Sequence, residues 1–231
     1  METTENPTNE VIKTSQSTYV TIDEKISRMK ITFGNATLPG IFETMQSVGY
    51  TAEKIDSMKA KLTGLENLQV MRNKEYAEQL AESAKFDTKR TELDVQYSTH
   101  RKLAKILFKT DVQAQSALQL DSPKPAVYAS WVQQVSGFYQ QLNNTALFKQ
   151  KVSAIGITAD VISRQLLTVD ELQALRDSQR KELSEAQTAT DARDKAFDEL
   201  YPLYMEYIQY AKVLLADNQA LEAIGVTVKA K

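Results

Sequence analysis

Apolar and small residues recur at steps of three and four through most of residues 172–216. The members of this stripe are Leu172, Leu175, Leu183, Ala186, Phe197, Leu200, Tyr204, Tyr207, Ala211 and Leu214. Polar Gln179, Thr190 and Arg193 interrupt it. A heptad-like stripe of this kind is typical of helices that pack lengthwise against other helices. The pattern therefore predicts a long amphipathic helix and an all-α fold.

A second segment, residues 65–109, has the same character, and the two segments together contain no glycine and only one proline, Pro202. Their middle stretches, 84–89 and 188–195, are almost free of large apolar residues. Two alternatives follow: each segment is one helix of over roughly 60 Å, at 1.5 Å per residue, or a hairpin folded at its polar middle. The absence of glycine and proline in those middle stretches favours the continuous helix.

The two long segments belong to an internal repeat. Thr51-Ala52-Glu53 recurs as Thr158-Ala159-Asp160, at an offset of 107 residues that continues through both segments. The matched pairs include Ile55 with Ile162, Leu65 with Leu172, Lys74-Glu75 with Lys181-Glu182, Glu78 with Glu185, Tyr97 with Tyr204, and Ala104-Lys105 with Ala211-Lys212. We expect a tandem duplication that forms a pseudo-twofold helical bundle or an antiparallel coiled coil with long helices.

The repeat and the composition of its flanks set the predicted domain organisation. The parts are a disordered N-terminal arm at 1–18, a first helical repeat at 19–120, a linker at 121–127, a second helical repeat at 128–226 and a C-terminal tail at 227–231. The linker contains Pro123 and Pro125, which disfavour helix at their own and the preceding positions. The arm is rich in Thr, Asn and Ser, a composition that does not support a packed core.

Shorter helices are predicted at 23–31, 128–142 and 146–154. Thr51 and Thr158 each stand two residues after a glycine and two before an acidic residue, so each can cap the N-terminus of the long helix that follows. The Gly-x-Thr sequence is therefore interpreted as a corner between helices. A phosphate-binding loop would need more glycine and a lysine at a fixed spacing.

A short signature recurs at the ends of the helical segments. The second repeat ends in Leu221-Glu222-Ala223-Ile224-Gly225-Val226, which follows Asp217-Asn218-Gln219-Ala220, and a related segment spans residues 152–157. These segments resemble a Leu-x-x-Leu-Gly-hydrophobic signature of uncharacterised bacterial helical proteins with tandem repeats. The resemblance implies a bacterial helical repeat protein. No activity is attached to that group, so it implies none for this chain.

Composition narrows the function classes further. The chain has 42% hydrophobic and 25% charged residues, which is typical of a globular protein, and its net charge of -2 gives no basic field for nucleic acid. Cysteine is absent, which excludes disulfides and thiolate chemistry. The N-terminus lacks the basic-then-apolar order of a secretory signal, and no stretch approaches 18 consecutive apolar residues. If the sequence is full length, we expect a cytoplasmic protein without a transmembrane segment.

Residue types that support catalysis are scarce. His100 is the single histidine, and Arg101 and Lys102 beside it are expected to disfavour its protonated form. Glu75 and Glu78, with Glu182 and Glu185 in the second repeat, lie three apart on a helix face and could in principle hold a hard cation. The adjoining lysines favour an ordinary solvated face instead. No nucleotide, zinc or hydrolase motif is present, so we expect no enzyme activity, cofactor or metal.

Tyrosines are concentrated in the last long segment. Tyr201, Tyr204, Tyr207 and Tyr210 fall at every third residue. Most of this density is expected to serve core packing, but a stripe of period three drifts around a helix, so some of the rings are candidates for an interaction surface. We therefore expect a non-enzymatic structural or protein-interaction scaffold with a protein partner or self-association. The alternatives are a membrane-active, pore-forming-like helical protein and a bundle that binds a small apolar ligand.

Overall fold

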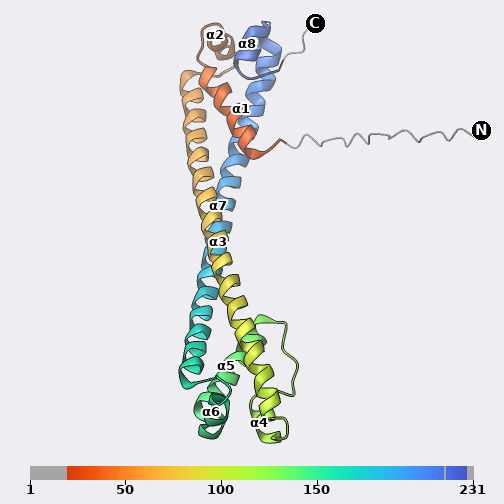
Figure 1. Cartoon of the computed structure of the whole chain (residues 1–231). Coiled ribbons are helices and arrows are strands. Elements are labelled where there is room, and N and C mark those ends of the chain that lie inside the picture. The colour runs from red at the N-terminus through yellow and green to blue at the C-terminus, as the bar shows by residue number, and fades with distance from the viewer. Residues whose placement is uncertain (1–19, 216, 228–231) are drawn as a thin grey trace, which may run out of the picture. The chain divides into compact units, whose positions relative to one another are not determined.

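The computed structural model describes residues 20–215 and 217–227. These residues form only α-helices joined by loops and turns, as Figure 1 shows, so the predicted all-α fold is confirmed. The helices are α1 (Ile22–Asn35), α2 (Ile41–Gln46), α3 (Ala52–Leu107), α4 (Val112–Ala117), α5 (Tyr128–Asn144), α6 (Ala146–Ser153), α7 (Ala159–Leu214) and α8 (Asn218–Ala223).

Helices α3 and α7 dominate the chain and pack against each other. Each contains 56 residues without a break. The continuous helix is therefore the correct alternative, and neither polar middle stretch forms the turn of a hairpin. The two helices also begin 107 residues apart, at Ala52 and Ala159, which is the offset of the sequence repeat. Pro202 lies inside α7 without ending it.

The chain divides into two compact units, and each takes residues from both long helices. Unit 1 consists of the residues up to Asn67 and from Lys195 onward, of which 20–67, 195–215 and 217–227 are described. Unit 2 is Leu68–Asp194. Each unit therefore combines residues of the first predicted repeat with residues of the second. The predicted arm at 1–18 and most of the tail at 227–231 lie outside the described residues.

The core of unit 1 is aromatic and is closed by α1, α2 and α8. The rings of Tyr50 and Tyr207 meet edge to face with centroids 4.9 Å apart, and both side chains are fully buried. The Thr32 hydroxyl donates to the Ile224 carbonyl at 2.7 Å, which ties α1 to the end of α8. The buried hydrogen bond satisfies a carbonyl that the short helix leaves unpaired.

The core of unit 2 is built from α4, α5 and α6 against the ends of the long helices. Phe138 of α5 lies against Tyr97 of α3 with centroids 5.4 Å apart. The Tyr97 hydroxyl donates to Gln134 Oε1 at 3.1 Å, so the polar end of this buried ring has a partner. Burial raises the pKa of Tyr97 to about 12.

The predicted Gly-x-Thr corners are confirmed. Gly49 and Gly156 have φ angles of 86° and 89°, a left-handed conformation that glycine adopts without a steric penalty. Thr51 Oγ1 then accepts a hydrogen bond from the Lys54 amide at 3.2 Å, and Thr158 Oγ1 accepts from the Val161 amide at 3.3 Å. These caps satisfy amides in the first turns of α3 and α7.

Candidate interaction surface

The polar middle of the two long helices is the most unusual part of unit 2. We call residues 68–85 of α3 and 173–194 of α7 the middle section. On the α3 side none of these residues is buried, and on the α7 side only Ala186 and Arg193 are. Helices that pack lengthwise normally bury an apolar seam. The sequence lacks that seam here because its apolar stripe is interrupted.

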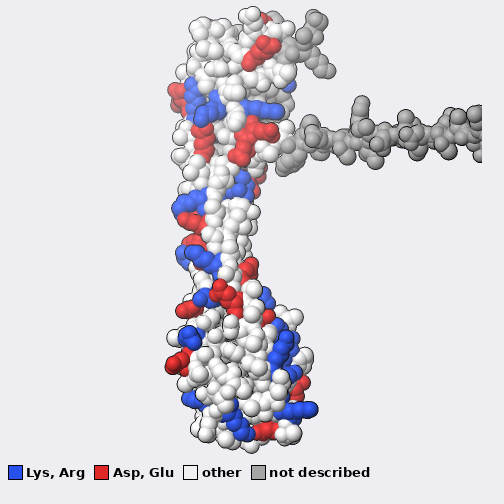
Figure 2. All heavy atoms as spheres, in the orientation of Figure 1, with Lys and Arg blue, Asp and Glu red and all other residues white. Residues whose placement is uncertain are grey.

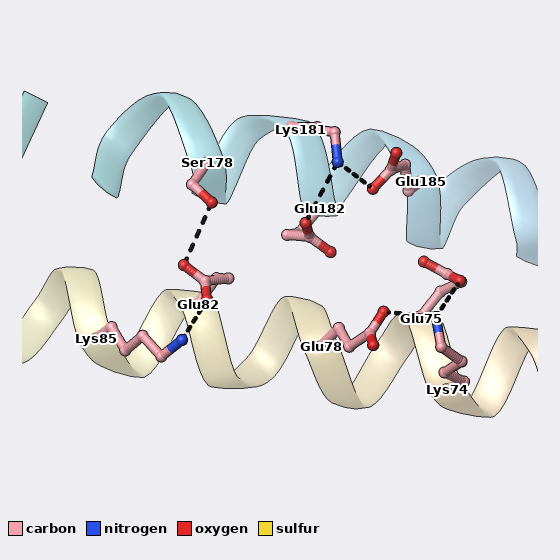
Figure 3. A network of polar contacts seen from close by, with 9 residues as sticks. All are labelled: Lys74, Glu75, Glu78, Glu82, Lys85, Ser178, Lys181, Glu182 and Glu185. Carbon is pink, nitrogen blue, oxygen red and sulfur yellow. Dashed lines mark hydrogen bonds and ion pairs between the residues drawn. The ribbon is translucent and has the colours of Figure 1, made fainter. Parts of the chain in front are cut away.

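Polar side chains replace the missing seam. The hydrogen bonds between the helices include Ser178 Oγ to Glu82 Oε2 at 3.3 Å, Gln179 Nε2 to Ser83 Oγ at 3.2 Å, and Arg193 Nη1 to Gln69 Oε1 at 3.1 Å. Figure 3 shows the first of these beside the charged residues of the same section. A hydrogen bond of this kind contributes only about 1 kcal/mol net, because its partners exchange it for bonds to water. The section is therefore held together weakly by its own contacts.

Four carboxylates gather in this section, and we call Glu75, Glu78, Glu182 and Glu185 the acidic cluster. In Figure 3 the carboxylates of Glu75 and Glu182 lie between the two ribbons. Their side chains are 18% and 16% exposed. Because Glu182 is the repeat counterpart of Glu75, the two copies of one sequence position meet across the helix pair. The prediction of an ordinary solvated face describes Glu78 and Glu185, at 46% and 45% exposed, better than these two.

Each helix supplies one lysine that partly neutralises the acidic cluster. Lys74 Nζ lies 3.0 Å from Glu78 and 3.1 Å from Glu75. Lys181 Nζ lies 3.2 Å from Glu185 and 3.8 Å from Glu182. The hydrogen bonds to Glu78 and Glu185 are the main cause of the raised pKa values of Lys74 and Lys181. Four carboxylates against two ammonium groups leave a net charge of two negative units.

Three members of the cluster have the donor geometry for a hard cation. Oxygen atoms of Glu75, Glu182 and Glu185 lie within 4.8 Å of one another. Carboxylate oxygens are the ligands that Ca²⁺ and Mg²⁺ prefer. Lysine ammonium groups already contact all three carboxylates, however, so a cation would have to displace them. The arrangement is equally explained by charge pairing within each helix.

Apolar side chains of the middle section are exposed beside these charges. They are Val70, Met71, Tyr76, Leu80 and Leu183, with exposed fractions of 69%, 54%, 45%, 50% and 56%. Tyr76 and Leu80 lie four residues apart, so they share a face of α3. Leu183 is the repeat counterpart of Tyr76 on α7. A groove of about 510 Å³, lined by Met71 and the acidic cluster, runs along the section. On the face that Figure 2 draws, basic and acidic side chains alternate along the chain.

Of the four tyrosines predicted as an interaction surface, unit 1 buries two and leaves two at least partly exposed. Tyr207 is fully buried and Tyr204 is 8% exposed, so both belong mainly to the core. Burial raises the pKa of Tyr207 to about 12. Tyr201 is partly exposed and stacks on Phe197 with centroids 5.0 Å apart, and Tyr210 is 43% exposed. Of the four, Tyr201 and Tyr210 therefore offer most of the ring surface that another molecule could contact.

His100 occupies a buried polar position in unit 2. Its Nδ1 lies 2.9 Å from the Tyr139 hydroxyl, and the residue is 8% exposed. Burial lowers the pKa of His100. The direction agrees with the sequence expectation, but burial rather than the neighbouring charges of Arg101 and Lys102 is the cause.

The buried histidine predicts a pH dependence of stability. Because the folded-state pKa is lowered, the unfolded chain takes up a proton first as the pH falls below about 6.5. We therefore expect the contribution of His100 to the free energy of unfolding to be constant above that pH. Below it, the free energy of unfolding should fall by at most about 1.4 kcal/mol per pH unit. Urea unfolding between pH 7.5 and 5.5 measures the effect. In His100→Gln, which can keep a bond to Tyr139, the slope in this window should be smaller; an unchanged slope would contradict the assignment.

Comparisons of the chain with protein-family models, with curated proteins and with solved structures gave no match. Within the described residues, no helix combines the length and apolar character that crossing a membrane requires.

Proposed function

We propose that this protein is a non-enzymatic helical scaffold that associates with a second copy of itself through the middle section of α3 and α7. The observation that carries the proposal is the inverted distribution of side chains in that section. Polar and charged groups lie between the helices, while Val70, Met71, Tyr76, Leu80 and Leu183 are exposed. Exposed apolar side chains beside a weak polar seam are typical of a helix pair that is completed by further helices.

A second copy fits this surface because the surface approaches self-complementarity. A dimer with twofold symmetry uses the same patch on both subunits. Tyr76 and Leu183 occupy equivalent positions of the two long helices, so both helices contribute an apolar side chain to the patch. Lys74 and Lys181 pair with carboxylates of the acidic cluster, which lowers the charge repulsion between two such surfaces. Two helix pairs would then form a four-helix bundle around these apolar groups.

The non-enzymatic part of the proposal rests on residue types. The chain has no cysteine, and its single histidine is buried against Tyr139. The four glutamates of the acidic cluster are paired with Lys74 and Lys181. A scaffold needs only a defined surface, and this part of the chain supplies one.

Analytical ultracentrifugation of the full chain over a range of concentrations tests the proposal. We expect a reversible dimer that dissociates on dilution. The triple variant Tyr76→Glu, Leu80→Glu, Leu183→Glu should remain monomeric at every concentration, because it places charges in the patch. All three side chains are exposed, so circular dichroism should show unchanged helix content.

The chain offers a matched control for the triple variant. Ile106 and Val213 are 74% and 82% exposed and occupy equivalent positions near the C-terminal ends of α3 and α7. Ile106→Glu and Val213→Glu should leave the dimer intact. A wild-type chain that stays monomeric, or control changes that dissociate the dimer equally well, would remove the support for this interface.

A further inference from the structure

A second surface, separate from the middle section, lies on unit 1. A groove of about 460 Å³ is lined by three basic residues, Lys25, Arg28 and Lys212, and by Tyr201 and Tyr204. Lys25 Nζ lies 5.1 Å from the centre of the Tyr201 ring, a cation–π contact. Within residues 20–215 and 217–227, no acidic side chain lines the groove and no carboxylate forms an ion pair with the three basic residues. The groove therefore concentrates positive charge beside aromatic rings.

Unit 2 shows what occupies the equivalent place there. Tyr204 corresponds to Tyr97 at the repeat offset of 107, and Ile208, which also lines the groove, corresponds to Arg101. The ends of α8 and α4 correspond as well, because Gly225 and Gln119 both have positive φ angles, of 80° and 49°.

In unit 2 a non-helical segment of the chain itself fills this place. Arg101 Nη2 donates to the carbonyls of Gln119, at 2.9 Å, and Leu120, at 3.4 Å, and also to the carbonyl of Ser122. Gln134 Nε2 donates to the Pro123 carbonyl at 3.4 Å. The predicted linker is thus bound along its backbone by side chains of α3 and α5.

One charged contact fixes a side chain of this bound segment. Lys124 Nζ lies 2.7 and 2.9 Å from the two carboxylate oxygens of Asp94, and the Trp131 indole donates to the same carboxylate at 2.8 Å. The place in unit 2 therefore selects a basic side chain on the segment that lies there.

The equivalent positions of unit 1 carry more positive charge. Tyr201 stands where unit 2 has Asp94, at the offset of 107. On the opening helix, where the offset is 109, Lys25 stands where unit 2 has Gln134, and Arg28 where it has Gly137. One acid is lost and two bases are gained, while Ile208 replaces one base, Arg101, so the net charge of the four positions rises by two units. A segment that pairs with these bases must carry carboxylates instead of a lysine.

We propose that the groove of unit 1 binds an extended acidic peptide segment of a partner protein. The peptide backbone would follow Gly225 and Val226, as the linker follows the end of α4 in unit 2. Its carboxylates would lie among Lys25, Arg28 and Lys212, and the charge complementarity would set its preference. Apolar side chains of the peptide would contact Ile208. This site does not depend on self-association through the middle section.

A pair of labelled peptides tests the proposal directly. The first has the sequence of residues 119–127 of this chain, Gln-Leu-Asp-Ser-Pro-Lys-Pro-Ala-Val, and the second has glutamate in place of its lysine. Fluorescence anisotropy with the full chain should show at least about tenfold tighter binding of the glutamate peptide, a difference of about 1.4 kcal/mol. The preference should weaken as salt is added, because the recognition is electrostatic.

Variants and competitors make the test specific. The double variant Lys25→Glu, Arg28→Glu should lose the preference for the glutamate peptide. The double variant Lys102→Glu, Lys105→Glu, which makes the same change of charge at exposed positions of α3, should retain it. Absence of binding below millimolar concentration, or equal binding of both peptides, would overturn the proposal. Inorganic phosphate, added at the same concentration of negative charge as the glutamate peptide, should not displace it. Displacement would also overturn the proposal, because the groove would then be a general anion site.

Discussion

Replacing Phe138 with alanine is expected to lower the stability of unit 2 by about 3–5 kcal/mol while leaving most of the stability of unit 1 intact. Phe138 is 2% exposed and its ring contacts both Tyr97 and Tyr139, with centroids 5.4 and 5.1 Å away. The expected loss of stability therefore has two causes: less apolar area is buried, and a cavity is left between aromatic rings. The two units have separate cores, and no large apolar side chain is buried in the middle section.

Hydrogen exchange followed by mass spectrometry measures both units in one experiment. In Phe138→Ala, amides of α5 and α6 should lose protection, and amides of α1 and α2 should keep it. Phe33 of unit 1 is 1% exposed and provides the reciprocal variant, Phe33→Ala, in which the pattern should be reversed. An equal loss of protection in both units, in either variant, would mean that the chain unfolds as a single cooperative block.

Replacing Pro202 with valine is expected to stabilise unit 1 by roughly 2 kcal/mol. Proline inside a helix lacks the amide that would bond to the carbonyl four residues earlier, and its ring crowds that carbonyl. Pro202 is exposed and lies inside α7, so no core contact has to be rebuilt. The repeat supplies the replacement, because α3 has Val95 at the equivalent position. Urea unfolding and exchange protection of the last turns of α7 measure the gain.

The reverse exchange on α3 is the matched control. Val95 is 57% exposed, and Val95→Pro should destabilise α3 by about 3 kcal/mol or more through the same loss of a backbone hydrogen bond. If Pro202→Val leaves the stability unchanged while Val95→Pro is costly, the backbone around Pro202 has already relaxed, and the expected gain is wrong.

The sequence predicted the long elements well because their signals are local. The absence of glycine and proline from the middle stretches indicated continuous helices, and the threonines after Gly49 and Gly156 located the helix starts. Helix α2 and the equivalent helices α4 and α8, six residues each, were missed because fewer than two turns give no readable periodicity. The sequence feature that could have located α4 and α8 is the aspartate before each of them: Asp111 caps α4, and Asp217 caps α8.

The candidate surfaces were harder to predict because they depend on which segments meet in space. The recurrence of Glu75 as Glu182 was visible in the sequence, but their approach requires the register between α3 and α7, which packing at distant positions sets. The tyrosine stripe likewise showed its period but not which rings are buried. The basic groove was missed altogether, because Lys25 and Arg28 are separated from Lys212 by most of the chain.

The composition of the compact units has a consequence for how the chain folds. Unit 1 takes residues up to Asn67 and from Lys195 onward, and unit 2 takes everything between them. A chain divided in the linker at 121–127 would therefore give two fragments, and neither fragment would contain all the residues of either core. Each half of the polypeptide supplies residues that the other half needs to bury its apolar side chains. The linker joins the halves covalently and so keeps them at high local concentration.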